Sequence, residues 1–307
     1  MTLIINVTTP DGIIMASDSR QSQRNIKQIT RISTNTADKL FQINDRVIVG
    51  TAGLAFFPNE KGMPTNVSKY ITDFSKENDL DDLTVKEIAY KLHDYINTKY
   101  PWEKQLDLSA QQLKIEAEQK GAQVLSIEKL DDSIEFKIKQ ANGRIEEGHL
   151  DIEAVDILVS GYNKNGTTQT YELRCPGEIT LERDIEEYGS TWVGQGDVVS
   201  RLILGYDSKM LNMPVFDRMS NHKKELLNQL HGLEYNIQWG LMTLQDAINL
   251  AVFLIKSTQM IQAYADGINM DIGDVQNVGG PIDIAVIRLD EGVDWINKKQ
   301  LHYPQDF

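Results

Sequence analysis

The chain opens with Met1-Thr2-Leu3-Ile4-Ile5-Asn6-Val7, turns at Pro10-Asp11-Gly12, and continues as an apolar run that ends in Ala16-Ser17-Asp18-Ser19-Arg20. After a polar stretch, Lys39-Leu40-Phe41-Gln42-Ile43 and the segment from Asp45 to Gly53 supply a second pair of apolar runs. Short apolar runs on either side of tight turns predict β-hairpins. We therefore expect two consecutive hairpins within residues 1–53, and the rest of the chain to be arranged around them.

Groups with complementary chemistry stand at the ends of these hairpins. Removal of Met1 would leave Thr2 with a hydroxyl and a free α-amine, whose ordinary pKa of about 7.7–8 makes it a usable base. The charge of Lys39 beside that hydroxyl would lower the pKa of the amine, and Asp18, expected on a neighbouring strand segment, would pair with Lys39. At Gly53 no side chain blocks the backbone, so its N–H could stabilise an oxyanion.

Each of these four residues also has an ordinary structural interpretation. Threonine after an initiator methionine is common, and Asp18 could belong to a solvated turn that closes a hairpin. Lys39 could be an exposed charge on a sheet edge, and Gly53 could let a strand pass into a helix. No single residue decides between the two interpretations, but their joint spacing favours a chemical role.

That spacing resembles the start of a proteasome β-type subunit, a family that belongs with its bacterial relatives to the N-terminal-nucleophile hydrolases. Asp18 lies sixteen residues after Thr2, and Gly53 lies fourteen residues after Lys39; both intervals match the family pattern. The interval from Asp18 to Lys39 is about five residues longer than in the family, so the polar loop 21–38 carries an insertion.

The resemblance assigns roles to individual residues. It implies that Thr2 is the nucleophile, that Asp18 and Lys39 are its supporting ion pair, and that Gly53 is the oxyanion donor. By the same resemblance, Ser22 and Thr51 are positioned to contact substrate.

The resemblance also implies the fold class: α/β (α+β), a four-layer α-β-β-α sandwich of two antiparallel sheets. Apolar periodicity of 3–4 residues, together with capping residues, predicts helices over residues 66–77, 84–99, 109–120, 197–204, 221–239 and 243–264. Apolar or alternating runs predict later strands over residues 124–130, 133–139, 154–162, 168–174, 179–183, 191–194 and 282–287. The strands between residues 154 and 194 are expected to form the second sheet, and residues 52–63 a loop that leads to a helix.

We expect one proteasome-like domain over residues 1–307, with an inserted helix-hairpin at about residues 101–152. Members of the family pass from their second helix almost directly to a strand, and here some fifty residues intervene. Such an insertion could cap the mouth of an active site, contact a neighbouring subunit, or only decorate the surface.

Two departures from the family pattern concern the groups around the terminal amine. Gln195 stands between Gly194 and Gly196, where the family carries a small hydroxyl residue. Val275 and Val278 stand where the family has an aspartate and a serine, and Asp274 lies one residue away from the expected position. The catalytic set is therefore expected to be intact, whereas its polar surroundings are altered.

The composition excludes several classes of function. The net charge of −14 argues against binding to nucleic acid or to an anionic membrane surface, because phosphates are bound by clustered Lys and Arg. The single cysteine, Cys175, cannot form an intrachain disulfide, and we interpret it as a passive buried thiol in a reducing cytoplasm. We see no secretory signal, no apolar run of about 18 residues, and no metal or cofactor motif. A cytoplasmic protein that needs no cofactor is expected.

The function that we predict is a threonine-type peptidase that cleaves peptides or unfolded proteins through an acyl-enzyme. A homo-oligomeric ring, or stacked rings, is what the resemblance implies; an ATP-dependent unfoldase partner stays open. Two alternatives remain. One is a catalytically silent structural subunit that keeps Met1 or in which the altered residues around the amine disable catalysis. The other is a ligase or transpeptidase that transfers the acyl group to an amine.

Overall fold

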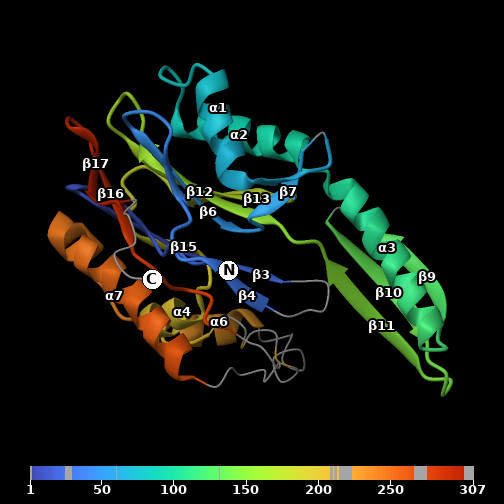
Figure 1. Cartoon of the computed structure of the whole chain (residues 1–307). Coiled ribbons are helices and arrows are strands. Elements are labelled where there is room, and N and C mark those ends of the chain that lie inside the picture. Colours follow the sequence, from blue (N-terminus) through green and yellow to red (C-terminus); the bar gives the residue numbers. More distant parts are fainter. Residues whose placement is uncertain are drawn as a thin grey trace, which may run out of the picture.

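The computed structural model describes residues 2–24, 30–59, 61–130, 132–207, 210, 213, 223–265 and 275–300. Within these residues the protein has a mixed α+β fold, in which every pair of neighbouring strands is antiparallel (Figure 1). Helices cover two five-stranded sheets, and a smaller helix-and-sheet unit projects from one side (Figure 1).

The first five-stranded sheet joins the beginning of the chain to its end. Its centre is the predicted hairpin of β1 (Leu3–Thr9) and β2 (Gly12–Ser17), and every residue of both strands is buried. The strand order is β15-β1-β2-β16-β17. The three outer members are β15 (Gly189–Gly194), β16 (Asp283–Arg288) and β17 (Gly292–Asn297). We expected residues 191–194 in the second sheet, and this was wrong: β15 pairs with β1.

The second five-stranded sheet contains the other predicted hairpin. Its strand order is β14-β13-β12-β6-β5. The strands are β5 (Leu40–Gln42), β6 (Val47–Gly53), β12 (Val155–Tyr162), β13 (Thr168–Cys175) and β14 (Ile179–Arg183). The two N-terminal hairpins therefore belong to different sheets. The expectation that Asp18 and Lys39 lie on neighbouring strand segments was wrong, because Asp18 follows β2 and Lys39 precedes β5.

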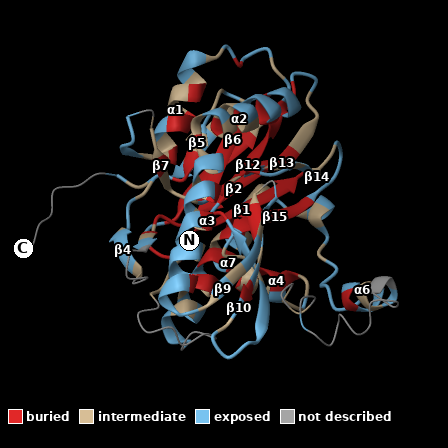
Figure 2. Ribbon diagram, turned by 90° about the vertical axis from the view of Figure 1, so that its right-hand side faces the viewer, coloured by how far each residue is buried: buried red, intermediate tan, exposed pale blue. Residues whose placement is uncertain are grey.

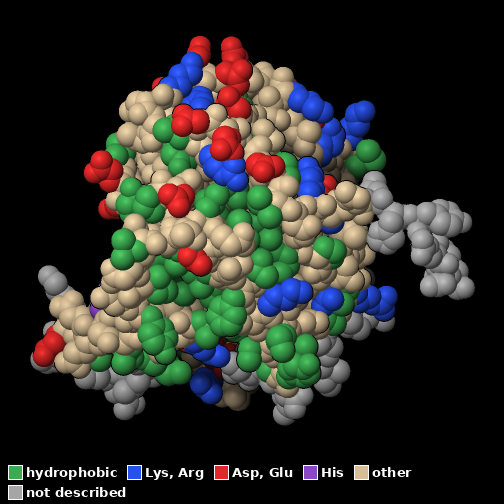
Figure 3. All heavy atoms as spheres, turned by 90° about the vertical axis from the view of Figure 1, so that its left-hand side faces the viewer, with side chains coloured by type: hydrophobic (Ala, Val, Ile, Leu, Met, Phe, Trp, Pro, Cys, Tyr) green, Lys and Arg blue, Asp and Glu red, His purple; other side chains and the backbone are tan. Residues whose placement is uncertain are grey.

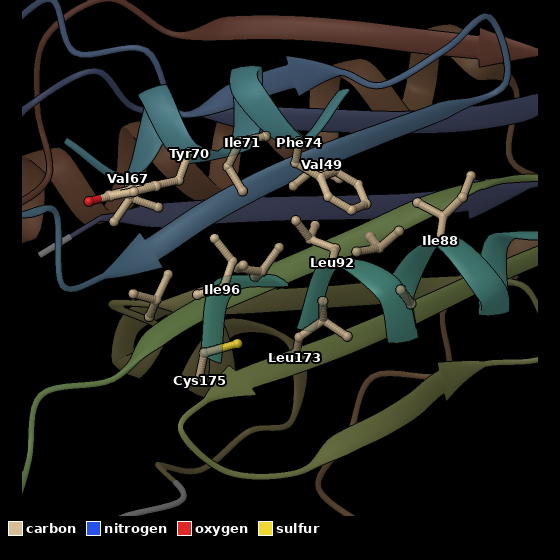
Figure 4. Close-up of a cluster of buried hydrophobic side chains, with 14 of the residues drawn as sticks. Val49, Val67, Tyr70, Ile71, Phe74, Ile88, Leu92, Ile96, Leu173 and Cys175 are labelled. Atoms are coloured by element: carbon tan, nitrogen blue, oxygen red, sulfur yellow. The ribbon is translucent and has the colours of Figure 1, made fainter. Parts of the chain in front are cut away.

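Three buried apolar clusters hold these elements together. One contains residues of both sheets, such as Ile4, Met15, Ile48 and Leu158. A second joins β6, β12 and β13 to helices α1 (Val67–Glu77) and α2 (Val85–Lys99) (Figure 4). A third joins β1, β2 and β16 to α4 (Asp197–Ile203) and α7 (Leu244–Tyr264). The central strands of both sheets are consequently buried, and the helices expose one side (Figure 2).

Capping residues fix where the principal helices begin. Asn66 caps α1, and Thr84 and Thr243 form capping boxes with Glu87 and Asp246 at the starts of α2 and α7. These helices agree with the prediction to within one residue. The helix expected over residues 221–239 is shorter than predicted: α6 spans Lys223–His231, and a 3-10 turn, η3, spans Trp239–Leu241.

Residues 102–151 form the projecting unit, which we call the arm. Helix α3 (Trp102–Gln119) begins seven residues before the predicted start at Ser109, directly after Pro101. The predicted hairpin is present as β9 (Gln123–Lys129) and β10 (Ser133–Lys139), and a third strand, β11 (Ile145–Asp151), was not predicted. The arm has a small core, made by Leu106, Ala110 and Ile134 together with Ile152, the residue that directly follows the arm.

Two short hairpins occupy segments that the sequence suggested were irregular. β3 (Gln21–Arg24) pairs with β4 (Thr30–Thr34), and β7 (Phe56–Pro58) pairs with β8 (Pro64–Asn66). Their polar or proline-containing sequences lack the apolar alternation by which strands are predicted.

The described residues contain no helix that is both long enough and apolar enough to cross a membrane. Cys175 is a buried free thiol, as predicted, and burial raises its pKa to about 12.

Candidate active site

Thr2 directly precedes β1, and hydrogen bonds of the backbone fix its position. Its carbonyl oxygen accepts a hydrogen bond of 2.7 Å from the N–H of Gln195, which follows β15. Gly194 has a φ of +90°, and a side chain there would overlap the same carbonyl, so only glycine allows this approach. The next residue, Leu3, donates its N–H to the Asp18 carboxylate at 3.0 Å. The backbone at Thr2 is therefore held by Gln195 on one side and, through Leu3, by Asp18 on the other.

Asp18 is fully buried, and both of its carboxylate oxygens are engaged. Oδ1 accepts hydrogen bonds from the N–H of Leu3 and from Lys39 Nζ, the latter at 2.7 Å. Oδ2 accepts from the N–H groups of Arg20 at 3.1 Å and Gly279 at 3.0 Å. A buried carboxylate needs this number of donors to offset its lost hydration. The alternative of a solvated turn does not fit a residue without exposure.

Lys39 is only 4% exposed and points into the same site. Its Nζ donates to Asp18 and, at 2.5 Å, to the carbonyl oxygen of Arg20. Burial lowers the pKa of Lys39 from its ordinary value, and the adjacent Asp18 carboxylate acts in the opposite direction. Because Lys39 is enclosed and paired, the interpretation as an exposed edge charge does not hold.

Gly53 ends β6 at the mouth of the site, with a φ of +75°. In the ladder with β12, Tyr162 N–H bonds to the Arg46 carbonyl, and alternation from that pair directs the N–H of Gly53 away from β12. A side chain at Gly53 would overlap the carbonyl oxygen of Ala154. The position therefore requires glycine and leaves a backbone donor facing away from the ladder.

A cavity of about 770 Å³ opens over these residues. Thr2 and Gly53 line it together with Ser22 of β3 and with Ile152 and Glu153 at the base of the arm. A smaller cavity of about 30 Å³ adjoins it and is lined by Thr2, Lys39, Thr51 and Gly53 among others. Five of the six residues singled out from the sequence thus line these two adjoining cavities, and the sixth, Asp18, is fully buried and pairs with Lys39.

The structure describes two of the places at which the sequence departs from the family pattern, around Gln195 and around Val275 and Val278. The Gln195 side chain bonds to Asp197 at 2.7 Å, so its contact with Thr2 is through the backbone alone. Val278 is fully buried. Val275 also belongs to the described chain, whereas Asp274, one residue away from the expected aspartate position, lies outside the described residues.

Several residues of the site were missed from the sequence. Arg20 bonds to Asn35 and to the carbonyl and side chain of Gln276, which ties the loop after β2 to the segment before β16. Asn277 accepts a hydrogen bond from Ser22 and lines the large cavity. Only the short polar run Gln276-Asn277 could have signalled these contacts, because their partners lie some 250 residues earlier in the chain.

A further cavity of about 430 Å³ lies on the Gln195 side and contains several acidic groups. Asp156 lines both this cavity and the large one, and its carboxylate lies 3.7 Å from Arg174. Burial raises the pKa of Asp156, against the opposing charge of Arg174. Burial, together with the charges of Glu182 and Asp156, raises the pKa of Glu172 to about 7. Among the described residues, no group of His, Cys, Asp and Glu is arranged to hold a metal ion.

Comparison with known proteins relates the chain to proteasome subunits. A sequence model of the proteasome subunit family matches residues 2–58. The proteasome subunit beta of Methanosarcina barkeri (strain Fusaro / DSM 804) is 27% identical over 144 residues, which are 46% of this chain and 62% of that protein. The match therefore spans less than two thirds of the relative's length. The structure of Anbu (ancestral beta-subunit) from Yersinia bercovieri aligns with a TM-score of 0.48 and 14% identity, over 96% of this chain and 87% of that one. The family model and the curated relative support the predicted resemblance to proteasome-like N-terminal-nucleophile hydrolases.

Proposed function

We propose, with this resemblance to proteasome subunits as the premise, that the protein is a threonine peptidase whose nucleophile is Thr2 after removal of Met1. Asp18 and Lys39 position and polarise the nucleophile, Gly53 is the oxyanion donor, and Ser22 and Thr51 contact the substrate. The substrate is a peptide or an unfolded protein.

One observation carries this proposal: Thr2 and Gly53 line the open cavity of about 770 Å³, and the Asp18–Lys39 pair, which is almost entirely buried, adjoins them. An ion pair without exposure is costly to maintain and gives little net stability. It is therefore better explained by chemistry at the adjacent hydroxyl than by a contribution to folding.

The reaction follows from the groups present. The Thr2 Oγ attacks the scissile carbonyl carbon while its proton passes to the Thr2 α-amine, and the resulting oxyanion accepts a hydrogen bond from the N–H of Gly53. The ammonium then returns the proton to the leaving nitrogen as the C–N bond breaks. A water molecule hydrolyses the ester that remains on Thr2, with the amine again taking the proton.

The finer features expected from the resemblance belong to the same proposal. They are a four-layer α-β-β-α arrangement, a single domain with the arm as an insertion, a cytoplasmic location, and a homo-oligomeric ring. The three buried clusters support the layered arrangement. Exposed apolar side chains on α7, Phe253, Met260, Ile261 and Tyr264, support an assembly, and hydrophobic side chains gather on the face that includes α7 (Figure 3).

The proposal is tested by the intact mass of the purified protein before and after incubation with a peptide epoxyketone. We expect a mass that lacks methionine, followed by a single adduct. The matched variants are Thr2→Ala, which should lose the adduct and the activity while remaining folded, and Thr2→Ser, which keeps a hydroxyl and should retain the adduct.

A retained methionine without an adduct would refute the proposal and favour a silent structural subunit. Formation of an adduct with products extended by an added amine, rather than hydrolysed, would instead indicate acyl transfer.

A further inference from the structure

Strand β11 is an open edge of the arm. The sheet order β11-β10-β9 gives β11 a neighbour on one side only within the described residues. The N–H of Ile152 bonds to the Asp132 carbonyl, and alternation along the ladder then assigns the even-numbered residues of β11 to bonds with β10. The backbone groups of the odd-numbered residues, including Glu147 and His149, point outward. Six of the seven residues of β11 are exposed, so nothing in the described chain covers this edge.

The open edge leads into the candidate active site. β11 ends at Asp151, and the next two residues, Ile152 and Glu153, line the cavity that contains Thr2. In Figure 1, β11 is on the side of the arm that is turned towards β3 and β4, and β3 supplies other walls of the same cavity. Because a strand advances about 3.3 Å per residue, a chain paired along β11 would reach the cavity within one or two residues of the end of β11.

Charges along the edge indicate what it accepts. In the ladder, Glu128 lies opposite Glu135, which lies opposite His149. Glu147 pairs with Lys137 at 2.6 Å, and His149 pairs with Asp151 at 2.7 Å. Glu153 adds a further carboxylate where the strand meets the cavity. β11 itself carries three carboxylates, those of Glu146, Glu147 and Asp151, and no Lys or Arg. An added strand that carries Lys or Arg would complement these carboxylates.

We propose that the free edge of β11 binds an extended, basic segment of the polypeptide substrate as an added strand and directs the chain into the Thr2 cavity. This rests on the proposed peptidase function and assigns the arm a role in it. Main-chain hydrogen bonds to the outward groups of residues 145, 147, 149 and 151 supply affinity, and the carboxylates supply the preference for basic side chains.

Binding is measured on the Thr2→Ala protein, so that no turnover is required. The probe is a fluorescein-labelled ten-residue peptide of alternating Lys and Thr, and its anisotropy gives the affinity. Hydrogen exchange with and without the peptide reports on the backbone. We expect slower exchange of the outward N–H groups of Glu147 and His149, and at least about tenfold weaker binding of the matching Glu-Thr peptide. Unchanged exchange across residues 145–151 on peptide binding would overturn the proposal.

Matched substitutions distinguish the contribution of an outward backbone N–H from that of the side chain at the same position. His149→Pro and Glu147→Pro remove an outward N–H that β10 does not use, so the arm should still fold. His149→Ala and Glu147→Ala keep that N–H. We expect the proline variants to bind at least about tenfold more weakly and the alanine variants to stay within about threefold of the parent. Equal loss in both sets would overturn strand addition. If a proline variant fails to fold, the hydrogen-exchange measurement on the parent protein is by itself the test of strand addition to β11.

Different results would refute the proposed peptidase function and the proposed role of β11. In the protein with Thr2 intact, His149→Pro should slow cleavage of a long unfolded basic substrate and leave cleavage of a tripeptide unchanged. Equal rates on the long substrate would contradict the role of β11. Absence of any cleavage, together with binding that is lost in His149→Pro, would refute the peptidase proposal and leave peptide binding at the edge in place.

Discussion

The two sides of Thr2 are built differently. On one side Asp18 and Lys39 are buried charges, and the carboxylate accepts four hydrogen bonds. On the other side the contact is a single backbone N–H from Gln195, whose side chain turns to Asp197, and the nearby carboxyls of Asp156 and Glu172 have raised pKa values. Donors surround the Asp18 carboxylate on the first side, whereas burial disfavours the charged forms of Asp156 and Glu172 on the second.

This difference predicts which substitutions the site tolerates. Where function depends on a buried ion pair, removal of one charged residue leaves the charge of the other buried without compensation. Where the contact is made by the backbone, the side chain is free to vary. The replacement of a small hydroxyl residue by Gln195 fits the second case.

The largest expected effect comes from Asp18→Ala. It leaves Lys39 buried with only the Arg20 carbonyl as acceptor, and we expect a loss of about 3–5 kcal/mol in the free energy of unfolding. Lys39→Met should cost less, about 2 kcal/mol, because Asp18 keeps three backbone donors. Both variants should lose peptidase activity, and urea denaturation measures the stability of each.

Asp38→Asn is the control for this comparison. Its side chain is 62% exposed and pairs with Lys299 at 3.0 Å, so we expect a change below about 1 kcal/mol. If Asp18→Ala lowers the free energy of unfolding no more than Asp38→Asn does, the buried pair of Asp18 and Lys39 does not make the hydrogen bonds described above.

Gly53 and Gly62 offer the next comparison, since both have a φ of +75°. A methyl group at Gly62 would have no neighbour within 4 Å, whereas one at Gly53 would overlap the Ala154 carbonyl. We expect Gly62→Ala to cost about 1 kcal/mol of stability from backbone strain alone, and Gly53→Ala to cost about 1–3 kcal/mol more. Only Gly53→Ala should lower peptidase activity. Equal stability losses would mean that β6 can move away from β12 at this point.

The sequence predicted the four central residues of the site better than the contacts that surround them. Thr2, Asp18, Lys39 and Gly53 fall within one continuous segment, where hairpin turns limit the possible geometry and the intervals match a known pattern. Arg20, Gln276 and Asn277 meet across most of the chain, and no local periodicity encodes such contacts. The assignment of Asp18 and Lys39 to neighbouring strands failed because local pattern predicts hairpins but does not say which sheet each hairpin joins. Strand β11 was missed because its exposed, charged sequence lacks an apolar alternation.

Glu172 provides a smaller test on the Gln195 side. Its pKa is raised from 4.5 to about 7, so between these values the folded protein holds a proton that the unfolded chain releases. Stability should therefore fall as the pH rises from about 4.5 to about 7 and then level off. Glu172→Gln should remove this fall and be more stable than the parent at pH 8 by about 1 kcal/mol, a value reduced for partial exposure, with no difference at pH 4. Unfolding free energies across this pH range measure the effect, and parallel curves for the two proteins would contradict it.

The smallest effect is expected from Gln195→Ala. The side chain bonds only to Asp197, and the backbone N–H that holds the Thr2 carbonyl is unchanged by the substitution. We expect peptidase activity within about threefold of the parent, because loss of one partly exposed hydrogen bond away from the reacting atoms changes the barrier little. Initial rates on a short peptide measure this. A loss of a hundredfold would mean that the Gln195 amide itself acts on the Thr2 amine, and the contrast between the two sides of Thr2 would then disappear.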